Sequence, residues 1–215
     1  MQRKLQKETP LILIVLLPFI YLAYIWNDLP AEVPVHWNLN GEVDRYSTKS
    51  ELVLIPILLP LLVYIILLIA PSIDPKKKLK NMGNKFKSIK ILLTLLMSVL
   101  ALFLLYHAKN NGKTSPYFIL PFIGVLYTIL GNYFKTIKTN YFIGIRTPWT
   151  LENDVVWKET HKMAGVLWFI GGITILVGSM VLDFRPSLNL GLVISIIIVI
   201  VPVLFSYVKF NDVTK

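Results

Sequence analysis

The segment around Arg146 holds the residues of this chain best suited to binding an anion or a partner. Arg146 follows an apolar run that ends at Ile145 and precedes Pro148 and Trp149. A guanidinium fixed in such a position can donate two parallel hydrogen bonds to a carboxylate or a lipid phosphate. Two interpretations stay open: a clamp that pins this segment to the rest of the protein, and a direct contact with a ligand or partner.

His161 is the other residue of this segment that could do chemistry. Trp157, His161, Ala164 and Trp168 are spaced as i, i+4, i+7 and i+11, which places them on one face of a helix. No Ser-His-Asp grouping, glycine-rich phosphate loop or carboxylate pair accompanies the histidine. A lone histidine on an aromatic stripe is more often a packing residue than a base or a ligand. We therefore expect neither an enzyme nor a cofactor.

The sequence also suggests how this segment folds. Residues 140–149 are expected to be extended, and Thr150 is predicted to be the N-cap of a helix with Glu152 and Asp154 in its first turn. Asp154 and Lys158 would then form an i, i+4 ion pair. The residues assigned to partner binding or to clamping the loop are Asn140, Gly144, Arg146, Thr147, Pro148, Trp149, Thr150, Trp157 and His161.

Residues 27–50 form a second segment with a specific pattern, and they predict a short β-hairpin. Asn40 and Gly41 both tolerate positive φ, and apolar residues alternate with polar ones ahead of them. The residues assigned to this external recognition loop are His36, Trp37, Asn38, Gly41 and Asp44. His36 with scattered carboxylates at Glu32, Glu42 and Asp44 is too weak a pattern to predict a metal site.

The elements that position these two segments are apolar runs of membrane-spanning length. The 215 residues are 55% hydrophobic, and the mean hydropathy is +0.64. An α-helix rises about 1.5 Å per residue, so runs of roughly 17–21 residues cover a bilayer core near 30 Å. The runs lie at residues 10–26, 52–70, 91–107, 117–134, 163–182 and 190–208, and none contains a charged residue. The pattern predicts an all-α polytopic membrane protein of about six transmembrane helices.

The distribution of lysine and arginine predicts the orientation of these helices. Seventeen lie in the N-terminal tail, residues 76–90, residues 135–162 and the C-terminal tail, against five in the other loops. By the positive-inside rule both termini are cytoplasmic, the 27–50 loop is external and the 135–162 loop is internal. The first run is interpreted as a retained signal anchor, because no small-residue cleavage site follows Trp26. The expected localisation is the cytoplasmic membrane of the cell.

Several functional classes lose support from composition. The chain has no cysteine, so disulfides, thiolate metal sites and cysteine nucleophiles are excluded. The net charge of +10 is distributed between apolar runs, which is typical of membrane topology and argues against direct nucleic-acid binding. The absence of charge in the runs also argues against a proton or ion carrier.

Other residues within the runs predict how the helices pack. Prolines at 18, 56, 60, 121 and 202 should kink helices without ending them, because neighbouring helices can satisfy the freed carbonyls. Small residues at helical spacing, namely Gly124, Gly131, Gly171, Thr174 and Gly178, should mark helix contacts.

The two polar segments resemble those of the SdpI-like bacterial immunity proteins. The match consists of residues 140–165, with Gly-Ile-Arg-Thr-Pro-Trp-Thr-Leu at 144–151 and Trp157 downstream, and of Val-Pro-Val-His-Trp-Asn at 33–38 with Gly41 and Asp44. The resemblance implies a membrane protein that protects a bacterium from a secreted peptide toxin. In such proteins a small cognate repressor can also be held at the membrane. The implied partners are therefore membrane lipid, a toxin outside and a repressor inside.

Alternatives to an immunity protein also remain. A small-molecule or lipid transporter is the main alternative, and inverted repeats would favour it, because a long loop follows the first span of each three-span half. We divide the single membrane domain into residues 1–90 with the loop 27–50, and residues 91–215 with the motif 140–165.

Overall fold

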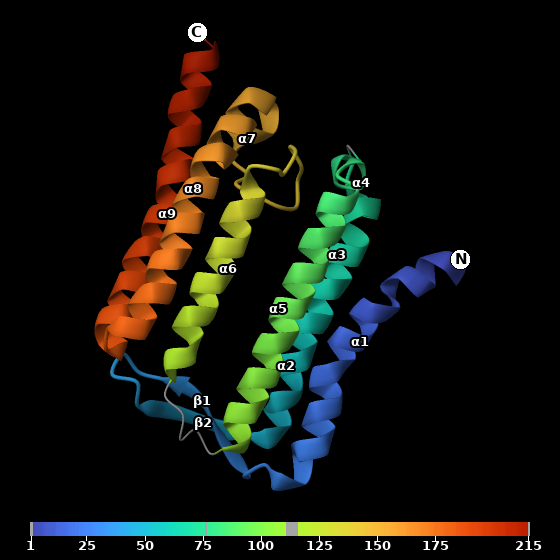
Figure 1. Cartoon of the computed structure of the whole chain (residues 1–215), viewed down its shortest axis with the longest axis vertical. Coiled ribbons are helices and arrows are strands. Elements are labelled where there is room, and N and C mark those ends of the chain that lie inside the picture. Colours follow the sequence, from blue (N-terminus) through green and yellow to red (C-terminus); the bar gives the residue numbers. More distant parts are fainter. Residues whose placement is uncertain (1, 76, 111–115, 215) are drawn as a thin grey trace. The chain divides into compact units, whose positions relative to one another are not determined.

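The computed structural model describes residues 2–75, 77–110 and 116–214, without the side chains of residues 2–7 and 116 (Figure 1). Its elements are α1 (Gln2–Ile25), β1 (Glu32–Trp37), β2 (Val43–Thr48), α2 (Leu54–Pro56), α3 (Leu62–Ile73), α4 (Lys78–Asn81), α5 (Asn84–Lys109), α6 (Ile119–Phe134), α7 (Pro148–Glu152), α8 (Asp154–Val181) and α9 (Phe184–Thr214). A π-helical turn over Ile57–Leu61 joins α2 to α3.

Five helical segments of the described chain are long and apolar enough to cross a membrane. They are Glu8–Asp28, Lys49–Ile73, Asn84–Lys109, Asp154–Val181 and Phe184–Thr214. The shorter α6 is also apolar, and it spans about 24 Å at 1.5 Å per residue. The predicted all-α membrane protein with a small hairpin is confirmed, and the chain is a multi-pass protein of the cell membrane. Its orientation in that membrane stays a prediction.

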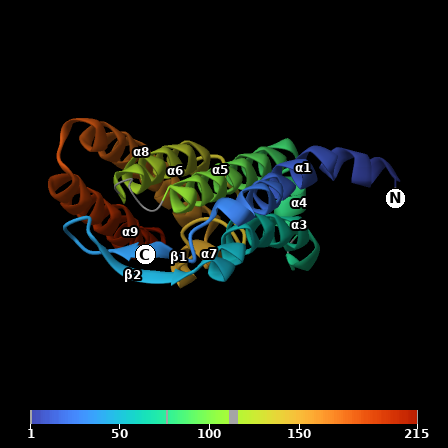
Figure 2. The ribbon, with the colours of Figure 1, turned by 90° about the horizontal axis from the view of Figure 1, so that it is seen from below.

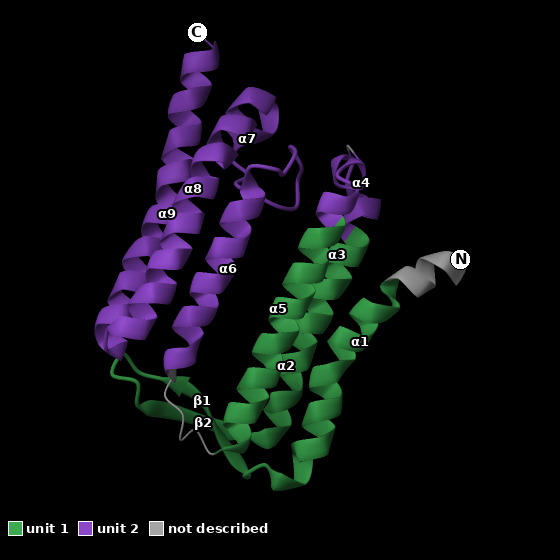
Figure 3. Ribbon diagram, viewed as in Figure 1, with its two compact units in different colours: residues 1–69, 87–116 green, residues 70–86, 117–215 purple. Residues whose placement is uncertain are grey.

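The chain divides into two compact units, each with three of these helices (Figure 3). Unit 1 comprises residues 1–69 and 87–116, and unit 2 comprises residues 70–86 and 117–215. The hairpin belongs to unit 1, and the segment around Arg146 belongs to unit 2. We therefore describe each unit by itself.

In unit 1 the two strands pair antiparallel as a two-stranded ribbon (Figure 2), and apolar side chains of β1 pack against helices of the same unit. Val33 is fully buried in a cluster with residues of α1 and α5, among them Ile25 and Leu105. Val35 packs against the same cluster, whereas Leu39 at the tip is 64% exposed. The alternating apolar residues therefore do form a packed face, which begins at Val33 and ends before the turn.

The hairpin turn forms around Asn38 rather than as a tight Asn40-Gly41 turn. The Asn38 carbonyl accepts from the Gly41 N–H at 2.9 Å, and the Asn38 N–H donates to the Glu42 carbonyl at 2.8 Å. Of the two expected residues only Gly41 adopts positive φ, at 81°. The side-chain oxygen of Asn38 accepts from the N–H groups of Asn40 and Glu42, so the longer loop is closed by an Asx-type turn.

Two prolines within helices are compensated by donors from a neighbouring helix. Pro18 cannot donate to the carbonyl of Ile14, and the Ser98 hydroxyl of α5 donates to that oxygen at 2.6 Å. Pro202 leaves the Ile198 carbonyl of α9 free, and the Trp168 indole of α8 donates to it at 2.8 Å. The prediction that neighbouring helices satisfy the freed carbonyls is confirmed at both positions.

Unit 1 also contains a charged cluster that the sequence did not indicate. The ammonium of Lys90 on α5 lies 2.6 Å from the Glu8 carboxylate of α1, and the Tyr64 hydroxyl of α3 donates to the same carboxylate at 3.2 Å. Lys90 is buried. The predicted apolar runs contain no charged residue, but helices α1 and α5 begin before these runs and include Glu8 and Lys90.

In unit 2, glycines bring α6 and α8 into backbone contact. A Cβ added to Gly131 would lie 2.3 Å from the Phe169 nitrogen, and one added to Gly172 would lie 2.4 Å from the Thr128 nitrogen. Gly171 and Gly178 instead face side chains of α9, with Ile194 and Leu190 closest. The predicted role of the small residues in packing is confirmed for the glycines, whereas the Thr174 hydroxyl bonds back to its own helix.

Candidate functional site

The candidate site is the segment between α6 and α8, where Asn140 is the main organising residue. Its side-chain amide donates to the carbonyls of Lys138 and Ile143, and its oxygen accepts from the N–H groups of Phe142 and Ile143, all within 2.7–3.0 Å. Asn140 is 2% exposed. One buried side chain therefore satisfies four backbone groups of a segment that has no regular secondary structure.

His161 of α8 anchors the next part of this segment. Its Nε2 accepts from the Ile145 N–H at 2.9 Å, and its Nδ1 lies 2.8 Å from the Trp157 carbonyl. Because a carbonyl only accepts, Nδ1 carries the proton and the imidazole is neutral. Trp157 stacks on the ring at 4.0 Å between centroids. Both nitrogens are engaged and the residue is 1% exposed, so this geometry suits an anchor and not a base or a ligand.

Gly144 is required at its position for two independent reasons. Its φ is +112°, a conformation that residues with a Cβ rarely adopt. A Cβ at this position would also lie 2.3 Å from Nε2 of His161. The glycine of the motif therefore permits the hydrogen bond between His161 and Ile145.

The short helix α7 begins at Thr147, not at the Thr150 that the sequence suggested. The Thr147 hydroxyl accepts from the Thr150 N–H, the Thr150 hydroxyl accepts from the Thr147 N–H, and Pro148 occupies the first turn. Thr150 is thus the third helical residue of a reciprocal capping box. The prediction was wrong because threonine can serve in either half of such a box, and the pattern usually has Glu or Gln in the second.

A second helix, α8, begins directly after α7, and its first turn differs from the expected one in its cap and in the partner of Asp154. Asn153 caps α8, with its side chain accepting from the N–H groups of Val155 and Val156. Asp154 does not pair with Lys158 among the ion pairs that the described residues form. It accepts instead from the Thr139 hydroxyl at 2.5 Å and lies 3.8 Å from Lys78 of α4. Contacts between segments distant in sequence replaced the local pair.

Helix α7 is attached to α9 by a polar and an aromatic contact. The hydroxyl oxygens of Thr147 and Ser206 lie 3.1 Å apart, and both residues are buried. The rings of Trp149 and Tyr207 meet edge to face with centroids 5.1 Å apart. The segment is thus held by α8 through His161 and by α9 through α7.

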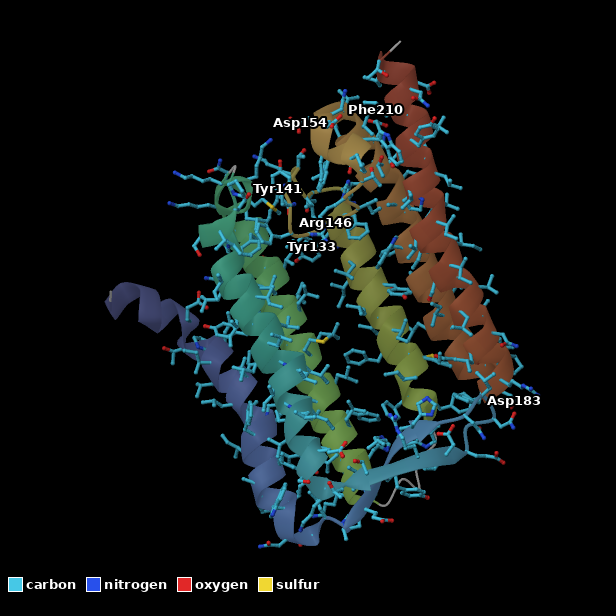
Figure 4. The ribbon with its side chains drawn as sticks, turned by 180° about the vertical axis from the view of Figure 1, so that it is seen from behind. Tyr133, Tyr141, Arg146, Asp154, Asp183 and Phe210 are labelled. Atoms are coloured by element: carbon cyan, nitrogen blue, oxygen red, sulfur yellow. The ribbon has the colours of Figure 1, made fainter. Side chains whose placement is uncertain are left out.

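Arg146 differs from the framework residues of this segment because its side chain is exposed. Its guanidinium donates through Nη1 to the Tyr141 carbonyl at 2.6 Å. Within the described part of the chain it forms no ion pair with a carboxylate. Figure 4 places Arg146 and Tyr141 at the same end of unit 2 as Asp154, with Asp183 at the other end.

The structure thus sorts the motif residues into two groups. Asn140, Gly144, Thr147, Thr150, Trp157 and His161 form the internal framework of the segment, while Arg146 and Pro148 are exposed and Trp149 is half-buried. The residues at the start of the stripe, Trp157, His161 and Ala164, are buried. The indole N–H of Trp157 donates to the Ile137 carbonyl at 2.8 Å, and this bond fixes the first turn after α6.

The hairpin residues form a polar face in unit 1. Nδ1 of His36 lies 2.6 Å from the Asp44 carboxylate, and the Asn38 amide donates to the Glu42 carboxylate at 2.9 Å. Trp37 is half-buried and Gly41 shapes the turn. Over the residues that the structure describes, no group of three or more His, Asp or Glu side chains could hold a metal ion.

Comparison with known proteins agrees with this division into two specific segments. Residues 136–206, which include the candidate site, match the model of the SdpI/YfhL protein family, and residues 13–59, which include the hairpin, match a domain of unknown function (DUF1648). The resemblance inferred from the two motifs is confirmed. The chain is thus a multi-pass membrane protein with a segment that matches the SdpI/YfhL family model.

One curated protein shows the similarity over most of the chain. The immunity protein SdpI of Bacillus subtilis (strain 168) is 28% identical over 173 residues, which cover 80% of this chain and 81% of that protein. No solved structure matches.

Proposed function

We propose that this chain is an immunity protein that protects the cell from a secreted peptide toxin, and that it acts by binding and not as an enzyme. The observation that carries the proposal is the similarity to the B. subtilis immunity protein SdpI, which extends over four fifths of both chains. A stretch of 173 residues in a chain of 215 must include residues 140–165, so the similarity extends over the segment around Arg146. The engaged polar groups of the candidate site also leave no free base or nucleophile in its framework.

We infer that the hairpin is external and the Arg146 segment cytoplasmic. The support is the distribution of Lys and Arg, with seventeen on the proposed inner side and five on the outer. In this orientation the hairpin is the part that a toxin meets first, and the Arg146 segment is the part that a cytoplasmic repressor can reach.

The polar face of the hairpin is our candidate for toxin recognition. Hydrogen bonds between His36 and Asp44, and between Asn38 and Glu42, hold these side chains in place before a partner arrives. Carboxylates outnumber cations over residues 27–51, which favours a cationic peptide. The excess is smaller than the sequence count suggests, because Lys109 lies 2.7 Å from Asp28 and already compensates it.

A survival assay tests the toxin proposal. A host lacking its own immunity gene would express the chain and be exposed to culture medium from a toxin-producing B. subtilis strain and, separately, from the strain that supplies this chain. We expect the wild type to protect against at least one of them, and Trp37→Ala and Asp44→Asn to protect less. Asp212→Asn, an exposed carboxylate on α9, is the matched control. No protection against either medium would refute the role.

We further propose that the exposed Arg146, together with Trp149 of α7, contacts a small cytoplasmic repressor. The rigid framework beneath Arg146 supports this proposal, because a preorganised guanidinium loses little entropy on binding. The alternative role of a clamp has weaker support, since the described contact joins Arg146 only to a carbonyl of its own segment.

One observation favours the second candidate function, a transporter or lipid-handling protein. Glu8, Lys90 and Tyr64 form a polar cluster among three helices of unit 1, and ionisable groups inside membrane bundles often line transport paths. The double variant Glu8→Gln/Lys90→Gln removes both charges while preserving size. Full toxin protection by this variant would show that immunity does not depend on the charged pair, and loss of protection at normal abundance would favour transport.

A further inference from the structure

Unit 2 contains a cavity of about 300 Å³ whose lining is rich in lysine. It lies where α4, the turn after α6 and the first turns of α8 meet. Its lining includes Lys78, Lys135, Lys138 and Lys158, and a single carboxylate, Asp154. That carboxylate already accepts from Thr139 and lies 3.8 Å from Lys78. Three lysines therefore face the cavity without an ion pair among the described residues.

The other polar side chains of this lining already form hydrogen bonds within the protein, and the hydroxyls of Thr136 and Thr139 donate to Tyr133 and Asp154. The Trp157 indole donates to the Ile137 carbonyl, and both nitrogens of His161 are engaged. Recognition therefore falls to the ammonium groups, which are mobile point charges without the fixed fork of a guanidinium. Such a site selects for negative charge and not for the shape of a headgroup.

A second cavity of about 560 Å³ adjoins the first through Lys135, which lines both. Its walls are mainly apolar and come from α6 and α8, with Val166, Phe169 and Ile170 exposed along it. Gly131 and Gly165 also line it, and Lys135 and Lys162 are its cationic residues. Lys135 directly follows Phe134, the last residue of α6, so the cationic end lies at the end of a membrane helix.

We propose that these two cavities together bind an anionic phospholipid, with the phosphate among Lys135, Lys138, Lys158 and Lys162 and an acyl chain along the apolar groove between α6 and α8. The combination of a cationic pocket at a helix end with an apolar groove that continues along the same helices matches the two halves of such a molecule. The site lies at the loop end of unit 2, where Figure 4 places Tyr133 and Asp154.

The experiment compares lipid binding to purified full-length protein in nanodiscs and by native mass spectrometry. The probes are phosphatidylglycerol, phosphatidylcholine of the same chain length, and inorganic phosphate as a competitor. We expect the wild type to retain phosphatidylglycerol preferentially, and Lys135→Gln/Lys158→Gln to lose at least about fivefold of that preference, because one lysine near an anionic headgroup contributes about that factor. Lys209→Gln on α9 lines neither cavity and is the matched control.

Two further measurements make the outcome decisive. Val166→Trp fills the groove from an exposed position without changing charge, and it should reduce retention of phosphatidylglycerol while leaving the salt dependence unchanged. Equal retention of both lipids by the wild type would overturn the proposal. Complete displacement of lipid by inorganic phosphate would also overturn it and would indicate a soluble anion as the ligand. Thermal unfolding of each variant identifies any that fail to fold, and Lys162→Gln then replaces the failed lysine variant.

Discussion

Nε2 of His161 accepts a hydrogen bond from the backbone N–H of Ile145 at 2.9 Å, although the two residues are sixteen positions apart. This bond joins the irregular segment after α6 to the buried face of α8. It needs a neutral imidazole with its proton on Nδ1, which the Trp157 carbonyl secures. The histidine of the motif is therefore explained by the fold of the segment.

Gly144→Ala should destabilise the protein far more than Gly83→Ala, although both glycines have positive φ. At Gly83 an added Cβ meets nothing within 4 Å, so the cost is the backbone strain of about 1–2 kcal/mol. At Gly144 the same strain adds to the loss of the His161 bond, for at least about 3 kcal/mol in total. Thermal unfolding in detergent measures both. Equal shifts would mean that the bond between His161 and Ile145 contributes nothing.

Arg146→Lys and Arg146→Gln should leave membrane abundance near that of the wild type, because the exposed side chain makes one hydrogen bond, worth about 1 kcal/mol. Recruitment of a fluorescent fusion of the cognate repressor should fall with both variants. Arg146→Lys should not preserve recruitment if the repressor binds both N–H groups of the planar guanidinium, because an ammonium cannot donate in that geometry. Arg185→Lys, an exposed arginine at the other end of α9, is the control. A joint fall in abundance, toxin survival and recruitment would identify a clamp instead.

Ser98→Ala should destabilise the protein only while Pro18 is present. The substitution leaves the Ile14 carbonyl without its donor. Pro18→Ala supplies a backbone N–H that can bond the same carbonyl, so the double variant should recover part of the loss. In a double-mutant cycle the coupling should be about 0.6–1.7 kcal/mol, the range known for hydrogen bonds within membranes. Additive effects would show that the carbonyl finds another partner.

Single cysteines can test the orientation, because the chain has none of its own. Leu39→Cys lies at the exposed hairpin tip and Lys85→Cys lies at the exposed start of α5. Both positions avoid the strain that cysteine would suffer at Gly41 or Gly83. A membrane-impermeant maleimide added to intact cells should label position 39 alone. Labelling of position 85 alone would show that the orientation is opposite to the predicted one.

The sequence predicted the spanning helices and the hairpin because both depend on local patterns. Apolar runs of sufficient length require a membrane, and Gly41 with alternating residues before it requires a turn. The start of α7 was misplaced because Thr147 and Thr150 are chemically equivalent as caps, and only the contact of Thr147 with Ser206 of α9 shows how the pair is arranged.

Contacts between distant segments account for the rest of what the sequence did not reveal. Glu8 meets Lys90 across 82 positions, and no spacing rule relates them. The predicted pairing of Asp154 with Lys158 was wrong for the same reason, because Lys78 and Thr139, which are more distant in sequence, contact Asp154 instead. Asn140 was assigned either to partner binding or to clamping the loop, and the sequence could not separate these roles, because its four hydrogen bonds depend on the path of the backbone around it.

The attachment of α7 to α9 through Thr147 and Trp149 has a mechanical consequence. Arg146 directly precedes Thr147, the N-cap of this short helix, and on its other side Ile145 is hydrogen-bonded to His161 of α8. Sliding or rotation of α9 against α8 must therefore either break the Ser206 and Tyr207 contacts or pull on the peptide that carries the guanidinium. The exposed arginine therefore lies in a short segment that is attached to α8 on one side and to α9 on the other. A movement of one of these helices relative to the other within the bilayer would displace Arg146.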